Sequence, residues 1–438
     1  MDRRTFLSVG GSSLAALTLA GEQVAKAAPS ERLRVGVMGT GGRALSLIHS
    51  FASNPNAEVV VLADIDPRKF PIAVEAVSKR QGKAPETVKD FRTILDRNDI
   101  DALVVGTPDH WHAIPSIMAC QSGRDVYVEK PDGHNIVEGQ TMVAAQRKHN
   151  RIVQLGTQSR TSSWMASAME YIKTGSLGRC LVAKAWETAR QGNIGRPADS
   201  DPPPEVDYDF WLGSAPLRPF NVRRFHGNWR WFYDYGTGDL GNDGVHRLDV
   251  ARWALQAGLS AQGQSLDLFP AKISASGGKW YFDDMQEWPD TLQVNYQYEG
   301  KSPAILTYEM RLWTAERLYE QTEGAAVYGD KGYIIMANGR WWAYDANRKE
   351  VAKGEGSNHE ADHVQNFIDC VKSREKSNAD LETVGHPSSL LCHCGNIASR
   401  LGRTIQFDPE TETFPHDPEA NALRTRPEYR KPWTLPEV

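Results

Sequence analysis

Apolar runs alternate with stretches of helical periodicity over the first third of the chain. Continuous apolar segments predict strands at residues 33–38, 58–63, 102–106, 125–128 and 152–155. Between the strands, apolar residues recur at helical spacing over residues 43–52, 67–80, 113–121 and 137–149. Such alternation is typical of an α/β domain whose parallel sheet is covered by helices on both faces. We expect this doubly wound domain to occupy residues 28–156.

The pattern changes after Thr157. A helix at 163–173 and a strand at 180–186 precede an irregular, proline-rich stretch over residues 196–220. Strand-like segments then follow one another with short turns, at 272–276, 291–298 and 304–311 and in a hairpin over 325–344. This order predicts an α+β domain over residues 157–407, with an open, largely antiparallel sheet. We expect helices at 362–371 and 388–401 to pack against that sheet, and the polar tail, 408–438, to wrap a surface or contact another subunit.

The N-terminal segment has the features of an export signal. Arg3 and Arg4 precede a weakly apolar stretch, residues 6–20, and a small-x-small cleavage pattern ends at Ala27. This order predicts a twin-arginine signal peptide over residues 1–27, with the translocation machinery as a partner and a periplasmic or secreted location. The alternative is an amphipathic helix of the folded domain. The stretch is too short to span a bilayer comfortably, so we expect no stable membrane span after processing.

Composition excludes some classes of function. The 438 residues carry a net charge of -5 and no long basic run, which argues against nucleic-acid binding. The odd number of cysteines, five, does not indicate a disulfide framework. Cys392 and Cys394 flank His393 in a helical pattern, where adjacent residues point in different directions, so we expect buried cysteines there. Folding could gather His110, His112, His226 and His246 into a metal site, but none of them shows the short helical spacing of a zinc motif, so we expect no metal.

A glycine-rich turn follows the first predicted strand and opens the first helix. In this turn, residues 39–44, Gly39 permits a tight turn and Gly41 lets the backbone approach a pyrophosphate, which the helix N-terminus would bind. Asp64 ends the second strand, 25 residues after Gly39, where a carboxylate would bond ribose hydroxyls and repel a 2′-phosphate. We therefore expect NAD, although Arg43, Arg68 and Lys69 leave NADP open. The alternative for Asp64 is a helix or turn cap.

Two polar loops follow the fourth and fifth strands. Residues 107–112 read Thr-Pro-Asp-His-Trp-His, and residues 129–131 read Glu-Lys-Pro. Open parallel sheets bind ligands outside the carboxyl ends of their strands, which is where both loops lie. In a partly dry cleft, desolvation disfavours the charged form of a lysine, so Lys130 could exchange protons there. The alternative for Lys130 is a surface charge before a proline.

These motifs, together with the glycine-rich segment 236–249, resemble the glucose-fructose oxidoreductase and inositol dehydrogenase-like family, Gfo/Idh/MocA. The resemblance covers nearly the whole chain after residue 27, including 366–370 and 392–403. It implies a Rossmann domain, an open-sheet domain, nicotinamide in the cleft between them and a homo-oligomer. The residues that it implies as cofactor ligands are Gly39, Thr40, Gly41, Gly42, Arg43, Asp64, Thr107, Pro108, His110, His112, Glu129, Lys130 and Gln158.

The resemblance also implies the reacting groups. Lys130 and His246 would handle the proton of a substrate hydroxyl while its carbon gives a hydride to the nicotinamide. Many members have an acid four residues before this histidine, where the present chain has Asn242, so either Asp243 substitutes or no carboxylate takes part. Asn242 can still bond a hydroxyl. Residues near the second-domain motif that could bind or stack on a sugar are Arg230, Tyr235 and Trp164.

Three functions are open at this point. The first is an exported NAD-dependent oxidoreductase that acts on a sugar, sugar acid, cyclitol or glycoside and keeps its cofactor tightly bound. The second is redox-neutral glycoside cleavage by transient oxidation, elimination and re-reduction, which needs a further base such as Tyr233 or Tyr235. The third is a non-catalytic, NAD-bound carbohydrate-binding protein, against which the presence of both Lys130 and His246 argues.

Overall fold

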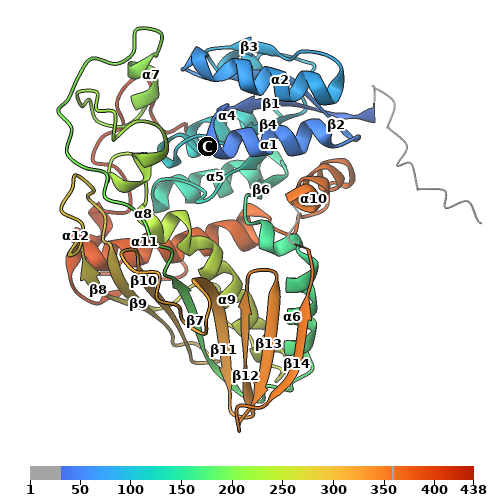
Figure 1. The fold of residues 1–438 in the computed structure, drawn as a ribbon, viewed down its shortest axis with the longest axis vertical. Coiled ribbons are helices and arrows are strands. Elements are labelled where there is room, and N and C mark those ends of the chain that lie inside the picture. Colours follow the sequence, from blue (N-terminus) through green and yellow to red (C-terminus); the bar gives the residue numbers. More distant parts are fainter. Residues whose placement is uncertain (1–30, 358–359) are drawn as a thin grey trace, which may run out of the picture.

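The structure, a computed structural model, describes residues 31–357 and 360–438. The expected signal peptide, with Arg3 and Arg4, lies outside these residues. Figure 1 shows two sheets, one above the other, each with its own helices. The upper sheet is built from the N-terminal third of the chain and the lower one mainly from later segments. The two-part α/β and α+β organisation is therefore as predicted.

The first sheet has six parallel strands in the order β3-β2-β1-β4-β5-β6, which is the Rossmann order. Its strands are β1 (Leu33–Met38), β2 (Ala57–Ala63), β3 (Glu86–Val88), β4 (Ala102–Val105), β5 (Asp125–Val128) and β6 (Val153–Leu155). Its helices are α1 (Gly42–Ser53), α2 (Phe70–Gln81), α3 (Arg92–Leu95), α4 (Ala113–Gln121) and α5 (Ile136–His149). The sequence did not predict β3, because this edge strand is short and exposed and so has no apolar pattern.

The second sheet has nine strands in the order β14-β13-β12-β11-β7-β10-β9-β8-β15. They are β7 (Cys180–Glu187), β8 (Lys272–Gly278), β9 (Thr291–Tyr298), β10 (Ala304–Arg311), β11 (Glu323–Gly329), β12 (Gly332–Ala337), β13 (Arg340–Asp345), β14 (Glu350–Glu355) and β15 (Ile405–Gln406). The β7 and β10 pair is parallel and the other pairs are antiparallel, so the predicted largely antiparallel sheet is confirmed. The sequence missed the two edge strands, β14 and β15.

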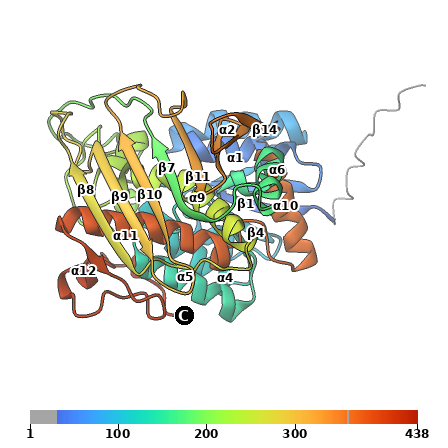
Figure 2. The same cartoon turned by 90° about the horizontal axis from the view of Figure 1, so that it is seen from below.

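Helices cover one face of this second sheet (Figure 2). Alternate residues of β9 are buried, from Leu292 to Tyr298, and they pack against α9 and α11 in one continuous core. The helices of this half are α6 (Ser163–Lys173), α7 (Tyr208–Leu212), α8 (Gly238–Asn242), α9 (Gly244–Ser260), α11 (His386–Leu401) and α12 (Pro418–Ala422). The expectation that the helix near 388–401 packs on the second sheet is confirmed.

The expectation for residues 362–371 was wrong. The helix there, α10 (Glu360–Ser373), packs on the Rossmann domain, where Phe367 lies edge-on to Phe51, with 6.2 Å between ring centroids. Val364 and Ile368 join the same core. An amphipathic pattern predicts that a helix has an apolar face but does not say which sheet will cover that face. The first domain is therefore completed by a segment that follows the second sheet in the sequence.

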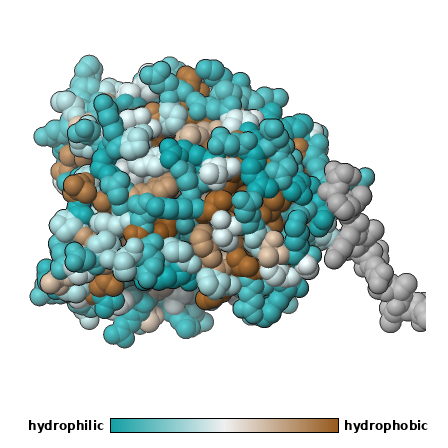
Figure 3. All heavy atoms as spheres, turned by 90° about the horizontal axis from the view of Figure 1, so that it is seen from above, coloured by the Kyte–Doolittle hydropathy of each residue, from teal (hydrophilic) through white to brown (hydrophobic). Residues whose placement is uncertain are grey.

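The surface is mostly polar on the face drawn in Figure 3, where hydrophobic side chains form small separate patches. Within residues 31–357 and 360–438, no helix is both long and apolar enough to cross a membrane. The C-terminal tail packs first on the second domain, through Phe414 and Ala420, and its end lies against the first domain. Near its end, Trp433 stacks on Phe210 and packs edge-on against Trp111.

A buried charge cluster joins α11 to the loop that follows Lys130. His386 Nδ1 lies 2.6 Å from Asp132 Oδ2, and His386 Nε2 lies 2.8 Å from Glu412 Oε2. Burial alone would lower the pKa of His386, but the two carboxylates raise it to about 10. Burial likewise raises the pKa of Asp132, but His386 and His393 together lower it to about 2. The charged pair therefore fixes this loop to α11 at neutral pH.

We expect this cluster to make stability depend on pH. Because the folded-state pKa of His386 is above its unfolded value of about 6.5, its contribution is complete below about pH 6.5 and is lost as pH rises through about 10. The free energy of unfolding should fall more steeply between these limits in the wild type than in His386→Gln. Urea unfolding at a series of pH values measures the difference. The exposed His416→Gln variant is the control, and parallel profiles for His386→Gln and the wild type would contradict the prediction.

Candidate active site

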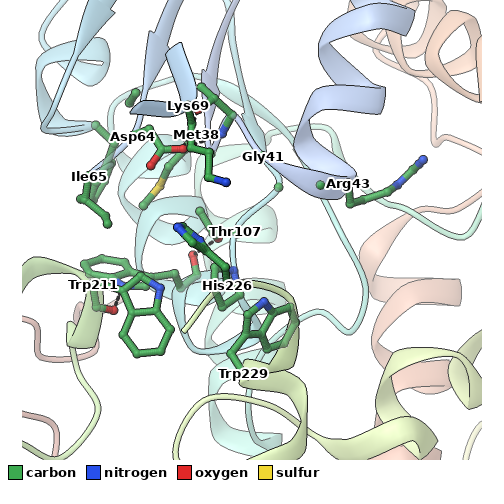
Figure 4. A pocket seen from close by; sticks show the side chains of 18 of the residues that line it. Met38, Gly41, Arg43, Asp64, Ile65, Lys69, Thr107, Trp211, His226 and Trp229 are labelled. Carbon is green, nitrogen blue, oxygen red and sulfur yellow. Dashed lines mark hydrogen bonds between the residues drawn. The ribbon is translucent and has the colours of Figure 1, made fainter. Parts of the chain in front are cut away.

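A cavity of about 360 Å³ lies between the Rossmann domain and a loop of the second domain (Figure 4). Its Rossmann side is the glycine turn, the end of β2 and the loop after β4. Its other side is the loop from His226 to Arg230, with Trp211 beside it. The predicted cofactor residues that line it are Gly39, Thr40, Gly41, Gly42, Arg43, Asp64, Thr107 and Pro108.

The glycine turn is packed as a dinucleotide-binding turn requires. Gly39 has a φ of 91°, and a Cβ on Gly39 would lie 3.0 Å from the Gly106 carbonyl oxygen. A Cβ on Gly106 would lie 2.7 Å from Ala44 Cβ, so helix and sheet approach closely here. No side chain caps the first turn of α1, which leaves its N–H groups available to an anion in the cavity. The turn therefore fits a bound pyrophosphate.

Asp64 is fixed at the edge of the cavity. Its Oδ2 accepts hydrogen bonds from Thr40 N, at 2.8 Å, and from Thr40 Oγ1, at 2.6 Å. The Arg68 guanidinium is bonded to Asp66 at 2.7 and 2.8 Å, whereas Lys69 lines the cavity. A carboxylate in this place favours ribose hydroxyls over a 2′-phosphate.

We expect Asp64→Ala to weaken NADH binding about 10- to 100-fold, because hydrogen bonds between the ribose and a charged carboxylate are lost. NADPH binding should become tighter, because the repulsion is removed and Lys69 remains. Fluorescence titration with both nucleotides measures the two affinities. Asp90→Ala, on the surface of the same domain, is the matched control. An unchanged NADH to NADPH ratio would show that Asp64 does not contact the ribose.

The second domain closes over the cavity through the short helix η5 (His226–Trp231). His226 Nε2 lies 2.9 Å from Asp66 Oδ2, across the two domains. Burial raises the pKa of Asp66, but hydrogen bonds from Arg68 and His226 outweigh burial and lower it to about 2. Sequence reasoning considered His226 only as a metal candidate. No sequence signal pairs two residues so far apart in the chain.

The reacting groups that the resemblance implies lie where the two domains join. Lys130 follows β5, and its Nζ donates to Asn242 O at 2.5 Å and to Asn242 Oδ1 at 3.2 Å. Asn242 ends α8, and His246 lies in the first turn of α9. The asparagine thus gives the lysine an uncharged acceptor. Asp243, at the start of α9, has a half-buried side chain.

The His246 ring is neutral in this site. Burial and the positive charges of Lys130 and Arg247 lower its pKa well below the usual value. No hydrogen bond holds either ring nitrogen among the residues that the structure describes. The ring can therefore accept a proton from a substrate hydroxyl.

Two buried carboxyl groups near this point were missed by the sequence reasoning. Asp239, in α8, is 1% exposed and has no hydrogen-bond partner for either oxygen among the described residues. Glu187, at the end of β7, is equally buried. Burial and the charge of Asp239 raise the pKa of Glu187 to about 9, and burial and the charge of Asp243 raise the pKa of Asp239 to about 8. The two coupled groups therefore hold a proton near neutral pH. Asp239 stood inside the glycine-rich motif, but only the fold brings Glu187 to it.

Three predicted cofactor residues form a partly buried link behind the glycine turn. Arg43 Nε donates to Glu129 Oε1 at 2.7 Å, and its other end pairs with Glu360 of α10. Gln158 Nε2 lies 3.4 Å from the same Glu129 oxygen. Figure 4 shows the Arg43 side chain pointing away from the cavity. These side chains join the Rossmann turn to α10, and only the backbone side of Arg43 faces a nucleotide.

Other predicted residues are not brought to the cavity. The ring of His110 lies between the carbonyls of Trp211 and Tyr235, and the ring of His112 joins Pro131 O, at 2.6 Å, to Thr107 O, at 2.9 Å. Both histidines therefore hold loops together. The Tyr235 side chain is fully buried and offers no face to a sugar. Trp164 lines a separate cavity of about 440 Å³ beside Arg247, while Arg230 does line the nucleotide cavity.

The five cysteines are free and buried, which confirms the expectation for Cys392 and Cys394. Across residues 31–357 and 360–438, no three His, Cys, Asp or Glu side chains are grouped so as to hold a metal ion.

Comparison with protein families agrees with this geometry. Residues 33–157 match the Gfo/Idh/MocA model described as an oxidoreductase family NAD-binding Rossmann fold. Residues 183–435, more than half of the chain, match the model of the C-terminal alpha/beta domain of the same oxidoreductase family.

Individual relatives share limited sequence identity with this chain. Levoglucosan dehydrogenase of Pseudarthrobacter phenanthrenivorans is 27% identical over 57% of this chain and 57% of its own length. An alpha-N-acetylgalactosaminidase of Shewanella oneidensis is 30% identical over 28% of each chain. The chain thus aligns with little more than half, or less, of these curated relatives. The fold matches the WlbA dehydrogenase from Bordetella pertussis, solved with NADH and UDP-GlcNAcA, at a TM-score of 0.62 and 19% identity, over 86% of this chain and 99% of that one. The chain therefore belongs to the Gfo/Idh/MocA oxidoreductase family and has its NAD-binding Rossmann domain.

Proposed function

We propose that this protein is an exported, NAD-dependent oxidoreductase that transfers a hydride between a hydroxyl-bearing carbon of a carbohydrate and a tightly bound nicotinamide. The substrate class is a sugar, sugar acid, cyclitol or glycoside. The observation that carries the proposal is the contact of the Lys130 ammonium with Asn242, beside the neutral ring of His246, where the nucleotide-binding domain meets the second domain.

The glycine turn and Asp64 would hold the cofactor. The N–H groups of the turn around Gly41 would bind the pyrophosphate, and Asp64 would bind a ribose. When bound, the nicotinamide accepts a hydride from carbon. His246 would take the hydroxyl proton as the C–H bond breaks, so that the substrate loses a proton and a hydride and becomes a ketone. Lys130 would donate a hydrogen bond to the substrate oxygen and act with His246 as an acid-base group.

Export and tight cofactor binding rest on the sequence. Arg3 and Arg4, followed by the apolar stretch and the cleavage pattern, support twin-arginine transport, which carries folded proteins. A protein that folds around NAD before export would meet no ready pool of free nucleotide afterwards. Such an enzyme must regenerate its cofactor within the same site, by a second substrate or by returning the hydride.

Redox-neutral glycoside cleavage is a second candidate. What favours it is the 30% identity with the alpha-N-acetylgalactosaminidase over part of the Shewanella oneidensis chain. The tyrosines considered as its extra base do not support it. Tyr235 is buried in the core, and burial raises its pKa; Tyr233 lines a different cavity.

Protein purified from the exported fraction tests these alternatives. The absorbance of reduced nicotinamide, followed as candidate sugars and glycosides are added, should rise if the oxidoreductase proposal holds. Release of aglycone without net reduction would favour cleavage. If protein that contains nucleotide gives neither signal across a broad panel, both proposals are overturned. Fractionation of an Arg3→Lys, Arg4→Lys variant tests export separately, and unchanged export would contradict the twin-arginine assignment.

A further inference from the structure

A second cavity, of about 770 Å³, shares no lining residue with the nucleotide cavity. We call it the tail cavity. Its walls are the loop after Pro131, the segment before α8, one side of α11 and the C-terminal tail from residue 422 to residue 431. The tail crosses this loop directly, since Val137 N donates to Arg424 O at 3.1 Å. Neither the nucleotide site nor the proposed reaction uses this cavity.

The tail cavity contains a buried arginine without hydrogen-bond partners. Arg426 is 7% exposed, and its Nε and Nη2 are buried with no acceptor in the part of the chain that the structure describes. The nearest carboxylate oxygen, Glu138 Oε1, lies 3.8 Å from Arg426 Nε, beyond hydrogen-bond range. Glu138 instead accepts from Asn135 and Tyr429. Buried guanidinium donors are rarely left unpaired, so this geometry calls for an external acceptor.

The wall of the tail cavity around Arg426 also carries more positive than negative charge. Among the lining residues, Arg430 is paired with Asp209, and Asp234 is paired with Arg218. The guanidinium of Arg400 lies over the ring of Tyr233, 4.7 Å from its centroid, with no carboxylate in an ion pair with it among the described residues. Arg426 itself faces Glu138 at 3.8 Å, which leaves Arg400 and Lys431 against Glu428, so positive charge is in excess.

The wall of the tail cavity also contains a neutral hydrogen-bond acceptor, His134. His134 Nε2 lies 2.8 Å from the Tyr233 carbonyl, to which it can only donate. Burial and the charge of Arg426 lower the pKa of His134 well below its usual value, so the ring is neutral. Its Nδ1 is therefore an acceptor, and it is buried without a partner among the described residues. A ligand hydroxyl would satisfy it.

We propose that the tail cavity binds a small hydroxylated organic anion, with its carboxylate or phosphate held by Arg426 and Arg400 and a hydroxyl donated to His134 Nδ1. The occupant would touch the loop that follows Lys130-Pro131 and Thr237, which precedes α8. Both segments lead to residues of the reaction centre. This site is separate from the nucleotide cavity and does not depend on the proposed reaction.

Isothermal titration of the full chain with sodium gluconate, inorganic phosphate and glucose tests the proposal. We expect saturable binding of gluconate, of phosphate or of both that depends on Arg426, whereas any binding of glucose in the reaction cleft should not depend on Arg426. The two anions tell a carboxylate site from a phosphate site. Arg426→Gln and Arg400→Gln should each weaken binding at least about tenfold, because a charge-assisted hydrogen bond is lost. Arg400 is exposed, so its variant should fold. Arg340→Gln, which changes an exposed side chain of β13, is the control, and Lys130→Met should leave anion binding at the tail cavity unchanged.

Three results would overturn the proposal. The first is no saturable binding of either anion up to about 10 mM. The second is equal affinity in the wild type and both arginine variants, which would place the anion elsewhere, including in the reaction cleft. The third is an oligomer that Arg400→Gln dissociates with no effect of anions, which would make a second copy of the chain the occupant. NADH titration of the same variants should be unchanged, because the nucleotide cavity is not altered.

Discussion

Replacing Lys130 with methionine is expected to lower the rate of hydride transfer about 10²- to 10⁴-fold, the usual contribution of a positioned acid or base. Methionine keeps much of the side-chain length but cannot donate to the substrate oxygen or to Asn242. Binding of NADH should change less than about threefold, because Lys130 does not line the nucleotide cavity. Single-turnover absorbance with the best substrate of the panel measures the rate.

The matched control is Lys173→Met, a surface lysine paired with Glu170 on its own helix. Its rate should equal that of the wild type. Lys130→Arg separates the possible roles, since arginine keeps the charge but does not release a proton in proteins. Full recovery in Lys130→Arg would reduce Lys130 to an electrostatic role. A rate within tenfold of the wild type in Lys130→Met would remove it from the reaction centre.

Sequence periodicity was enough for the Rossmann half of the fold. Strands buried on both faces are continuous apolar runs, and their crossover helices have clear helical spacing, so each element is visible locally. The motifs at Gly39, Asp64 and Lys130 follow strand ends, and parallel strands bring those ends to one edge of the sheet. The close approach of Lys130 to the second domain did not follow from the pattern. It came from the resemblance, and the contact with Asn242 is consistent with it.

The remaining features depend on contacts that no local pattern encodes. The helix α10 packs on the first sheet although it follows the second one in the sequence. The pairing of Asp239 with Glu187 requires the relative position of α8 and β7, and the link between His226 and Asp66 crosses two domains. His110 and Tyr235 show the opposite case, since residue types that suit a ligand site are used to pack loops. Chemistry can be proposed from residue type, but burial decides which side chains remain free for it.

The largest effect on stability is expected at Asp249, three residues after His246 in α9. Its two carboxylate oxygens accept from Arg160 Nε at 2.8 Å and from Arg160 Nη2 at 2.6 Å, and Ser388 Oγ donates to it at 2.6 Å. The side chains of Arg160 and Asp249 are only 9% and 1% exposed. Asp249→Asn keeps the shape but leaves Arg160 buried without its counter-charge. We expect the free energy of unfolding to fall by about 3–5 kcal/mol.

Urea unfolding at neutral pH measures this loss. If the free energy of unfolding depends on urea concentration with the same slope in both proteins, the unfolded state is unchanged. The control is Asp283→Asn, whose partner Arg196 is exposed, and its cost should stay below about 1 kcal/mol. Equal costs for the two variants would show that burial adds nothing to the pair at Asp249. The helix that carries His246 is fixed to residues 158–161 through Arg160, so a destabilised Asp249→Asn protein should also lose hydride transfer as it unfolds. Lys130→Met should lose hydride transfer while its unfolding midpoint stays close to that of the wild type. Asp249→Asn and Lys130→Met together therefore separate loss of structure from loss of chemistry.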